Sequence, residues 1–61
     1  MENFNYSFRV VRESKLLGVR FPVTDWFSDF SEANSACLVF SERYEDLKTF
    51  YFLVECKIEK S

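Results

Sequence analysis

The sequence predicts an α+β fold, in which a three-stranded antiparallel sheet of order 2-1-3 carries one helix packed on one face, in the chain order ββαβ. Residues 4–12 place apolar side chains on one face of a strand with the period of two that is typical of strands, and residues 49–59 are rich in the aromatic and branched residues of a strand whose alternate positions form one apolar face. Residues 31–45 instead place their apolar side chains at helical spacing. A chain of 61 residues has room for a single domain, 1–61.

The first two strands are expected to form a hairpin. The first covers residues 4–12, a polar turn follows at residues 12–15, and the second strand covers residues 16–23. Pro22 lies near the end of the second strand, where the loss of a ladder hydrogen bond is tolerated best. The residues expected on the covered face of this hairpin are Phe4, Tyr6, Phe8, Val10, Leu17, Val19, Phe21 and Val23.

The helix is expected over residues 31–45. Ser31 is a residue type that caps helix N-termini, and Glu32 is favoured there by the helix dipole. The small residues of the apolar stripe suit close packing on a sheet. This stripe consists of Ala33, Ala36, Cys37, Phe40 and Tyr44.

The last strand, residues 49–59, is expected beside the first. Because the hairpin is antiparallel and the helix returns the chain, the last strand runs antiparallel to the first and pairs with it, which gives the order 2-1-3. Its covered face carries Phe50, Phe52, Val54, Cys56 and Ile58. The helix covers one face of the sheet, and the open face then carries Asn5, Ser7, Arg9, Val11, Leu16, Gly18, Arg20, Tyr51, Leu53, Glu55 and Lys57.

The composition argues against several classes of function. A net charge of −2 gives no general basic field for nucleic acid, so we do not expect nucleic acid as the main partner. The chain has no His to act as a base near neutral pH, and one Gly rules out a glycine-rich phosphate loop. Two cysteines, Cys37 and Cys56, are too few for a structural zinc site. We therefore expect no enzyme, no bound metal and no cofactor.

The chain is also expected to have no membrane span and to be cytoplasmic. Its longest apolar run, residues 50–54, is far shorter than the roughly 18 residues of a transmembrane helix. The first nine residues lack a charged leader followed by an apolar stretch, so no secretory signal is expected. Both cysteines are then expected to be reduced and buried.

Three large rings lie in the loop 24–30, in a chain whose aromatic content is 20%. In one interpretation Trp26 and Phe30 fold back and close the end of the core. In the other, Trp26 or Phe27 projects as an anchor for a partner, since large rings are enriched at binding hot spots. Together with the acidic neighbours of the rings, the candidate partner-binding residues are Trp26, Phe27, Phe30, Asp25, Asp29 and Glu32.

The open sheet face is a second candidate, because its basic and aromatic residues resemble the surface of sheet-type RNA binders. Two simpler interpretations stay open: the face is solvated, or it forms a homodimer contact over Val11, Leu16, Tyr51 and Leu53. The residues of this alternative nucleic-acid surface are Arg9, Arg20, Tyr51, Leu53 and Lys57.

In size, lack of catalytic groups, aromatic richness and strand order, the whole chain resembles the small proteins with which bacteriophages inhibit host machinery, including anti-CRISPR and other anti-defence proteins. The resemblance assigns no role to any residue. It implies a stoichiometric inhibitor that binds a larger protein, of host defence or nucleic-acid processing, in the host cytoplasm. We therefore expect a protein-binding module, with a nucleic-acid-binding module and an accessory subunit or homodimer as the alternatives.

Overall fold

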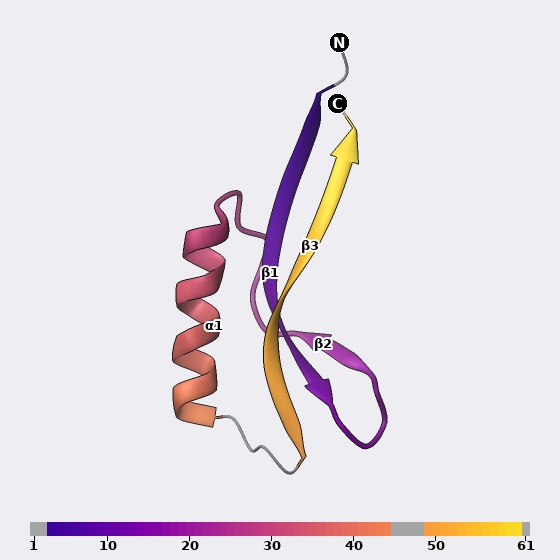
Figure 1. Cartoon of the computed structure of the whole chain (residues 1–61), viewed down its shortest axis with the longest axis vertical. Helices are drawn as coiled ribbons and strands as arrows, with labels where there is room; N and C mark the ends of the chain where they lie inside the picture. The colour runs from indigo at the N-terminus through magenta and orange to yellow at the C-terminus, as the bar shows by residue number, and fades with distance from the viewer. Residues whose placement is uncertain (1–2, 45–48, 61) are drawn as a thin grey trace.

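The computed structural model describes residues 3–44 and 49–60. It contains four elements in the order β1 (Phe4–Ser14), β2 (Arg20–Pro22), α1 (Phe30–Tyr44) and β3 (Phe50–Lys60). The strands form one antiparallel sheet of order β2-β1-β3 (Figure 1). The predicted ββαβ fold and its strand order are therefore confirmed.

The pairing of β1 with β3 dominates the sheet. It runs without interruption from Phe4 opposite Lys60 to Ser14 opposite Phe50. The first strand is thus longer than predicted, because Ser14 still has a partner in β3. The turn follows at residues 15–17, and Gly18 closes it with a φ of 71°, a conformation that glycine adopts without steric strain.

The second strand is much shorter than the predicted range 16–23. Only Arg20–Pro22 pair with β1, because Glu13 faces Arg20 and the intervening residues form the hairpin loop. Leu16 is 90% exposed at the tip of this loop. Four residues expected on the covered face are exposed as well, because the hairpin loop and β2 lie beyond the part of the sheet, β1 and β3, on which α1 packs. They are Leu17, Val19, Phe21 and Val23.

Helix α1 begins at Phe30, and its N-cap is Asp29 rather than the predicted Ser31. The Asp29 carboxylate accepts the Ser31 backbone N–H at 3.0 Å, and the Asp29 carbonyl accepts the Ala33 N–H at 3.3 Å. The predicted helix end at residue 45 lies outside the described residues. An aspartate satisfies the unpaired N–H groups of a first turn as well as a serine does, which explains the shift.

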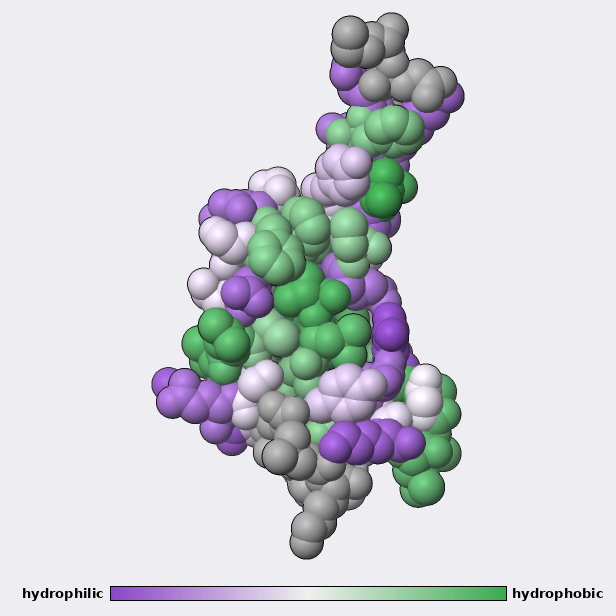
Figure 2. Space-filling model, viewed as in Figure 1, coloured by the Kyte–Doolittle hydropathy of each residue, from purple (hydrophilic) through white to green (hydrophobic). Residues whose placement is uncertain are grey.

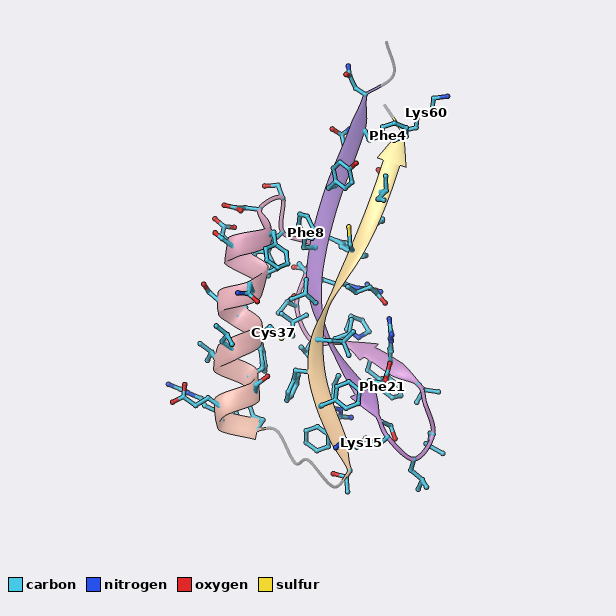
Figure 3. The ribbon with its side chains drawn as sticks, viewed as in Figure 1. Phe4, Phe8, Lys15, Phe21, Cys37 and Lys60 are labelled. Atoms are coloured by element: carbon cyan, nitrogen blue, oxygen red, sulfur yellow. The ribbon has the colours of Figure 1, made fainter. Side chains whose placement is uncertain are left out.

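The predicted helix stripe packs on the sheet along most of its length. Ala33 and Cys37 are buried, and the ring of Phe40 lies 5.4 Å from that of Phe52 on β3. Figure 3 places Cys37 on the side of α1 that faces the strands, with Phe8 between β1 and α1. The last member of the stripe, Tyr44, is exposed, contrary to the prediction.

The described residues form an elongated molecule with a thin core. Its fully buried large side chains are Val10 and Val11, which belong to opposite faces of β1. The Cα radius of gyration is 12.9 Å, against about 10.5 Å for a compact chain of this length. The principal extents are 46, 23 and 14 Å.

Beyond α1 the described part of the sheet consists of β1 and β3 alone. We call residues 4–7 with residues 57–60 the distal ribbon and the remaining described residues the body; Phe4 and Lys60 lie together at the far end (Figure 3). The fifteen residues of α1 reach about 22 Å, whereas the eleven residues of β1 reach about 37 Å, so the helix cannot cover the whole strand. Four residues predicted to be covered are therefore exposed, namely Phe4, Tyr6, Cys56 and Ile58.

Candidate functional site

The loop between β2 and α1 follows the outer edge of β1. The Val23 N–H donates to the Val10 carbonyl at 2.9 Å, and the Val10 N–H donates to Thr24 Oγ1 at 3.0 Å. Further along, Phe8 and Phe27 exchange two backbone hydrogen bonds of 2.8 and 2.6 Å. The loop is therefore held to the sheet at both ends of its aromatic segment.

Between these two attachments the loop is longer than the strand beside it. Pro22 pairs with Val11 and Phe27 pairs with Phe8, so the loop side contains two more residues than the β1 side. Extra residues on one side of a pairing make the chain bulge and turn a side chain in a new direction. Here the bulge contains Asp25 and Trp26.

Trp26 lies on the sheet face opposite α1. Its ring covers the guanidinium of Arg9 at 4.3 Å and the Nζ atom of Lys57 at 4.5 Å. These two cations come from β1 and β3, whose odd-numbered residues share that face. Cation–π contacts of this kind contribute roughly 0.5–1 kcal/mol each at exposed sites. The ring is half-buried against these two side chains, rather than projecting into solvent or closing the core under α1.

The other two rings of the loop lie elsewhere. Phe27 is half-buried at its bridge to β1. Phe30 begins α1 and packs edge to face on Phe8, at 5.5 Å between ring centroids, while half of its surface stays exposed. Because Phe8 belongs to the helix-facing side of β1, the structure separates Phe30 from Trp26 by the thickness of the sheet.

A hollow of about 580 Å³ opens beside Trp26. It is wide open to solvent, with the Asp25 carboxylate and the Arg9 guanidinium as its charged groups. It can accept a protruding side chain that carries a polar end. The residues that line it are Arg9, Pro22, Val23, Thr24, Asp25 and Trp26.

The acidic residues of the predicted site have separate positions. Asp25 lines the hollow, Asp29 caps α1, and Glu32 lies in the first helical turn. All three are exposed. Of the predicted partner-binding set, only Asp25 and Trp26 therefore come together in one hollow, and there they meet Arg9, which was predicted for the alternative surface.

Ion pairs neutralise the basic residues of the open face. Arg9 contacts Glu55 through Nη2 at 2.7 Å and through Nε at 2.8 Å. Arg20 contacts Glu13 at 2.5 Å and Glu55 at 3.8 Å. Lys57 also has a carboxylate partner on the same strand, at 3.0 Å. A nucleic-acid phosphate would have to compete with these carboxylates for each of the three cations.

Tyr51 is held by the same network. Its hydroxyl donates a hydrogen bond to Glu13, which lowers the pKa of Glu13, with the Arg20 contact acting in the same direction. The same bond raises the pKa of Tyr51, and the Glu13 carboxylate raises the pKa of Arg20. Lys15 Nζ lies 5.7 Å from the Tyr51 ring. Tyr51, which was predicted for the alternative nucleic-acid surface, thus belongs to an ion-pair network.

Two residues of the predicted open face are less open than expected. Val11 is only 1% exposed, and Leu53, its partner across the sheet, is half-buried. On that face Val11 is flanked by Arg9 and Glu13, whose side chains reach across to β3 and to Arg20. Val11 therefore has almost no free surface to contribute to the homodimer contact that was one interpretation of this face.

The sequence reasoning missed Glu13 and Glu55 as organising residues of this face. The sequence pattern puts Glu55 on the open face without indicating a role, and it puts Glu13 in a turn, whereas in the structure Glu13 pairs with Tyr51 of β3. The residue spacing does indicate the position of Glu13, because Glu13 continues the series Arg9 and Val11 on the same face of the strand.

Within the described ranges, 3–44 and 49–60, no cluster of His, Cys, Asp or Glu is arranged to hold a metal ion. The one described helix lacks the length and apolar character needed to cross a membrane. Comparison with protein-family models, with curated proteins and with solved structures finds no match to the chain.

Proposed function

We propose that this chain is a protein-binding module that acts as a stoichiometric inhibitor of a larger protein, with Trp26 and the hollow beside it as the contact site. One observation carries the proposal: the Trp26 ring is fixed over Arg9 and Lys57 at the rim of an open hollow. A large ring that already packs on neighbouring side chains has less conformational entropy to lose when a partner packs against it.

The chemistry of the site favours a protein over other partners. A pocket for a small molecule encloses most of its ligand, whereas this hollow is wide open. Phosphate groups would meet cations already paired with carboxylates, and the site itself contains Asp25. Trp and Arg side by side are typical of the residues that dominate protein–protein binding energy.

The charge distribution favours a partner with a basic contact surface. Residues 24–46, which include the loop and the helix, carry six acidic and one basic side chain. Opposite charge on a partner speeds association and selects among partners. A nucleic-acid channel on the larger protein has this character, and occupying it would block the nucleic acid. Together with the resemblance to phage inhibitors, this supports an inhibitory role.

Quantitative affinity capture from a lysate of the native host tests the contact site. Trp26→Ala should reduce the amount of captured partner by about tenfold or more, as expected for loss of a hot-spot ring. Phe21→Ala is the matched control, because it removes another exposed ring from the same sheet and should leave capture unchanged. A Trp26→Ala variant that stays folded and captures as much partner as the unmodified chain would contradict the contact site.

The inhibitory role needs a second measurement on the captured partner. Its activity should fall in proportion to the chain added and reach its minimum at a fixed stoichiometric ratio, which native mass spectrometry can determine. Full partner activity at saturating amounts of the chain would contradict inhibition while leaving the contact site intact.

A further inference from the structure

Among the described residues, no strand pairs with the outer edge of β3. In β1, the N–H groups of Phe8, Val10 and Ser14 bond to the loop and hairpin side, so the odd-numbered residues of β1 bond to β3. The odd-numbered residues of β3 accordingly face β1. Backbone N–H and C=O groups of the even-numbered residues then point to the open edge, and the central ones belong to Val54, Cys56 and Ile58.

The side chains along this edge are complementary to themselves. When two copies of β3 pair antiparallel with Cys56 opposite Cys56, each Glu55 faces Lys57 of the second copy, and this pair adds to the contacts that Glu55 makes with Arg9 and Lys57 with Glu59 within each chain. Val54 then faces Ile58 in the same way. Cross-strand pairs of opposite charge and of branched apolar residues both stabilise antiparallel sheets.

Neighbouring registers are less favourable. Shifting the centre by one residue places Glu55 opposite Glu55, or Lys57 opposite Lys57, and like charges facing each other are destabilising. Centring the pair on Ile58 also opposes unlike charges, Lys57 and Glu59, but it engages only the last few residues of β3 and leaves Val54 out.

We infer that two copies of this chain associate through the open edges of β3, antiparallel and centred on Cys56, to form a continuous six-stranded sheet. The interface uses residues that the monomer leaves accessible, since Cys56 is exposed and Ile58 is 59% exposed. An unpaired edge is a template for a further strand, and a second copy with the complementary sequence satisfies it.

The arrangement also accounts for the distal ribbon. A two-fold axis perpendicular to the sheet places both helices on the same face. Each α1 packs on β3 near Phe52. In this register that end of β3 lies beside the distal ribbon of the other copy. The exposed apolar side chains Tyr6 and Ile58 thereby gain a neighbouring helix. Figure 2 shows apolar residues that continue from the helix-facing surface onto the ribbon.

Sedimentation equilibrium over about 1 µM to about 1 mM chain tests the dimer through its register. Lys57→Glu should raise the dimer dissociation constant about tenfold or more, because it sets Glu opposite Glu at two symmetric places. An equal mixture of Glu55→Lys and Lys57→Glu should restore dimers, since each charge then faces its opposite. The matched control Glu59→Lys should dimerise like the unmodified chain.

Cys56→Pro provides a test that leaves the charges in place. It removes an N–H that points to the open edge and leaves the β1 to β3 ladder intact, so the monomer should stay folded and dimerisation should be lost. Cys56→Ala keeps the N–H and should dimerise. A monomer at every concentration would overturn the inference, as would dimers that survive Lys57→Glu and are broken by Glu59→Lys. None of these outcomes depends on the proposed function.

Discussion

The body and the distal ribbon consist of the same two paired strands, yet they differ in how far their side chains are buried. In the body Val10 is completely buried between the sheet and α1. In the ribbon Tyr6, four residues earlier on the same face, is 51% exposed. The alternation is the same in both regions, and only the covering helix is missing from the second. Periodicity therefore indicates which face is apolar, while the length of the covering element decides how much of that face is buried.

The largest difference between the body and the distal ribbon is expected when buried side chains are truncated. Val10→Ala removes fully buried carbon atoms, and we expect it to lower the free energy of unfolding by about 2 kcal/mol. Ile58→Ala removes a larger group from the ribbon, where the Ile58 side chain is mostly exposed. It should change the free energy of unfolding by less than about 0.5 kcal/mol. Urea unfolding at low protein concentration measures both. Equal losses would mean that the ribbon is as well packed as the body.

The helix cap should produce a smaller effect. Asp29→Ala leaves the Ser31 N–H without its side-chain acceptor, and we expect a loss of about 1 kcal/mol. Asp29→Asn, an equally good cap, should be neutral and serves as the control. Thermal unfolding monitored by circular dichroism distinguishes them. If both variants are neutral, the packing of α1 on the sheet does not depend on this cap.

The smallest effect is expected from the ion-pair network, which lies on the open face of the body. Because the pKa of Glu13 is lowered in the folded chain, Glu13 stabilises the fold at pH values above the ordinary glutamate pKa. This stabilisation is lost as the pH falls through the lowered pKa. The raised pKa of Tyr51 gives stabilisation below the ordinary tyrosine pKa of about 10, which is lost as the pH rises through the raised value.

Unfolding measured between acid and alkaline pH tests this network. Glu13→Gln should flatten the acid side of the stability profile, and Tyr51→Phe should flatten the alkaline side. Glu59→Gln is the control, because Glu59 belongs to the distal ribbon and its contact with Lys57 is exposed. If Glu13→Gln loses stability at acid pH just as the unmodified chain does, other carboxylates determine the acid side of the stability profile.

The sequence was sufficient for the element types and their order, because long alternating and helical patterns are strong signals. It was also sufficient for the packing of Ala33, Cys37 and Phe40 on the sheet. Element lengths were harder to predict. The first strand was ended at Arg12 because the next residues are polar, although pairing with β3 continues to Ser14.

The candidate site was predicted only in part, for a reason of geometry. Trp26 and Phe30 are close in sequence, and nothing in the sequence specifies the two extra residues that place them on opposite faces of the sheet. The role of Arg9 in the hollow depends on that same bulge. Long-range register of this kind is set by tertiary packing rather than by local pattern.

Amide hydrogen exchange tests the central claim, that one ladder contains a covered body and an uncovered ribbon. The N–H groups of Val11 and Asn5 both face β3, where Val11 pairs with Leu53 and Asn5 with Glu59. Val11 is buried in the body, whereas Asn5 is exposed in the ribbon. At low protein concentration we expect the amide of Val11 to be protected at least about tenfold more than that of Asn5, a difference of about 1.4 kcal/mol. Equal protection of the two amides would contradict the claim.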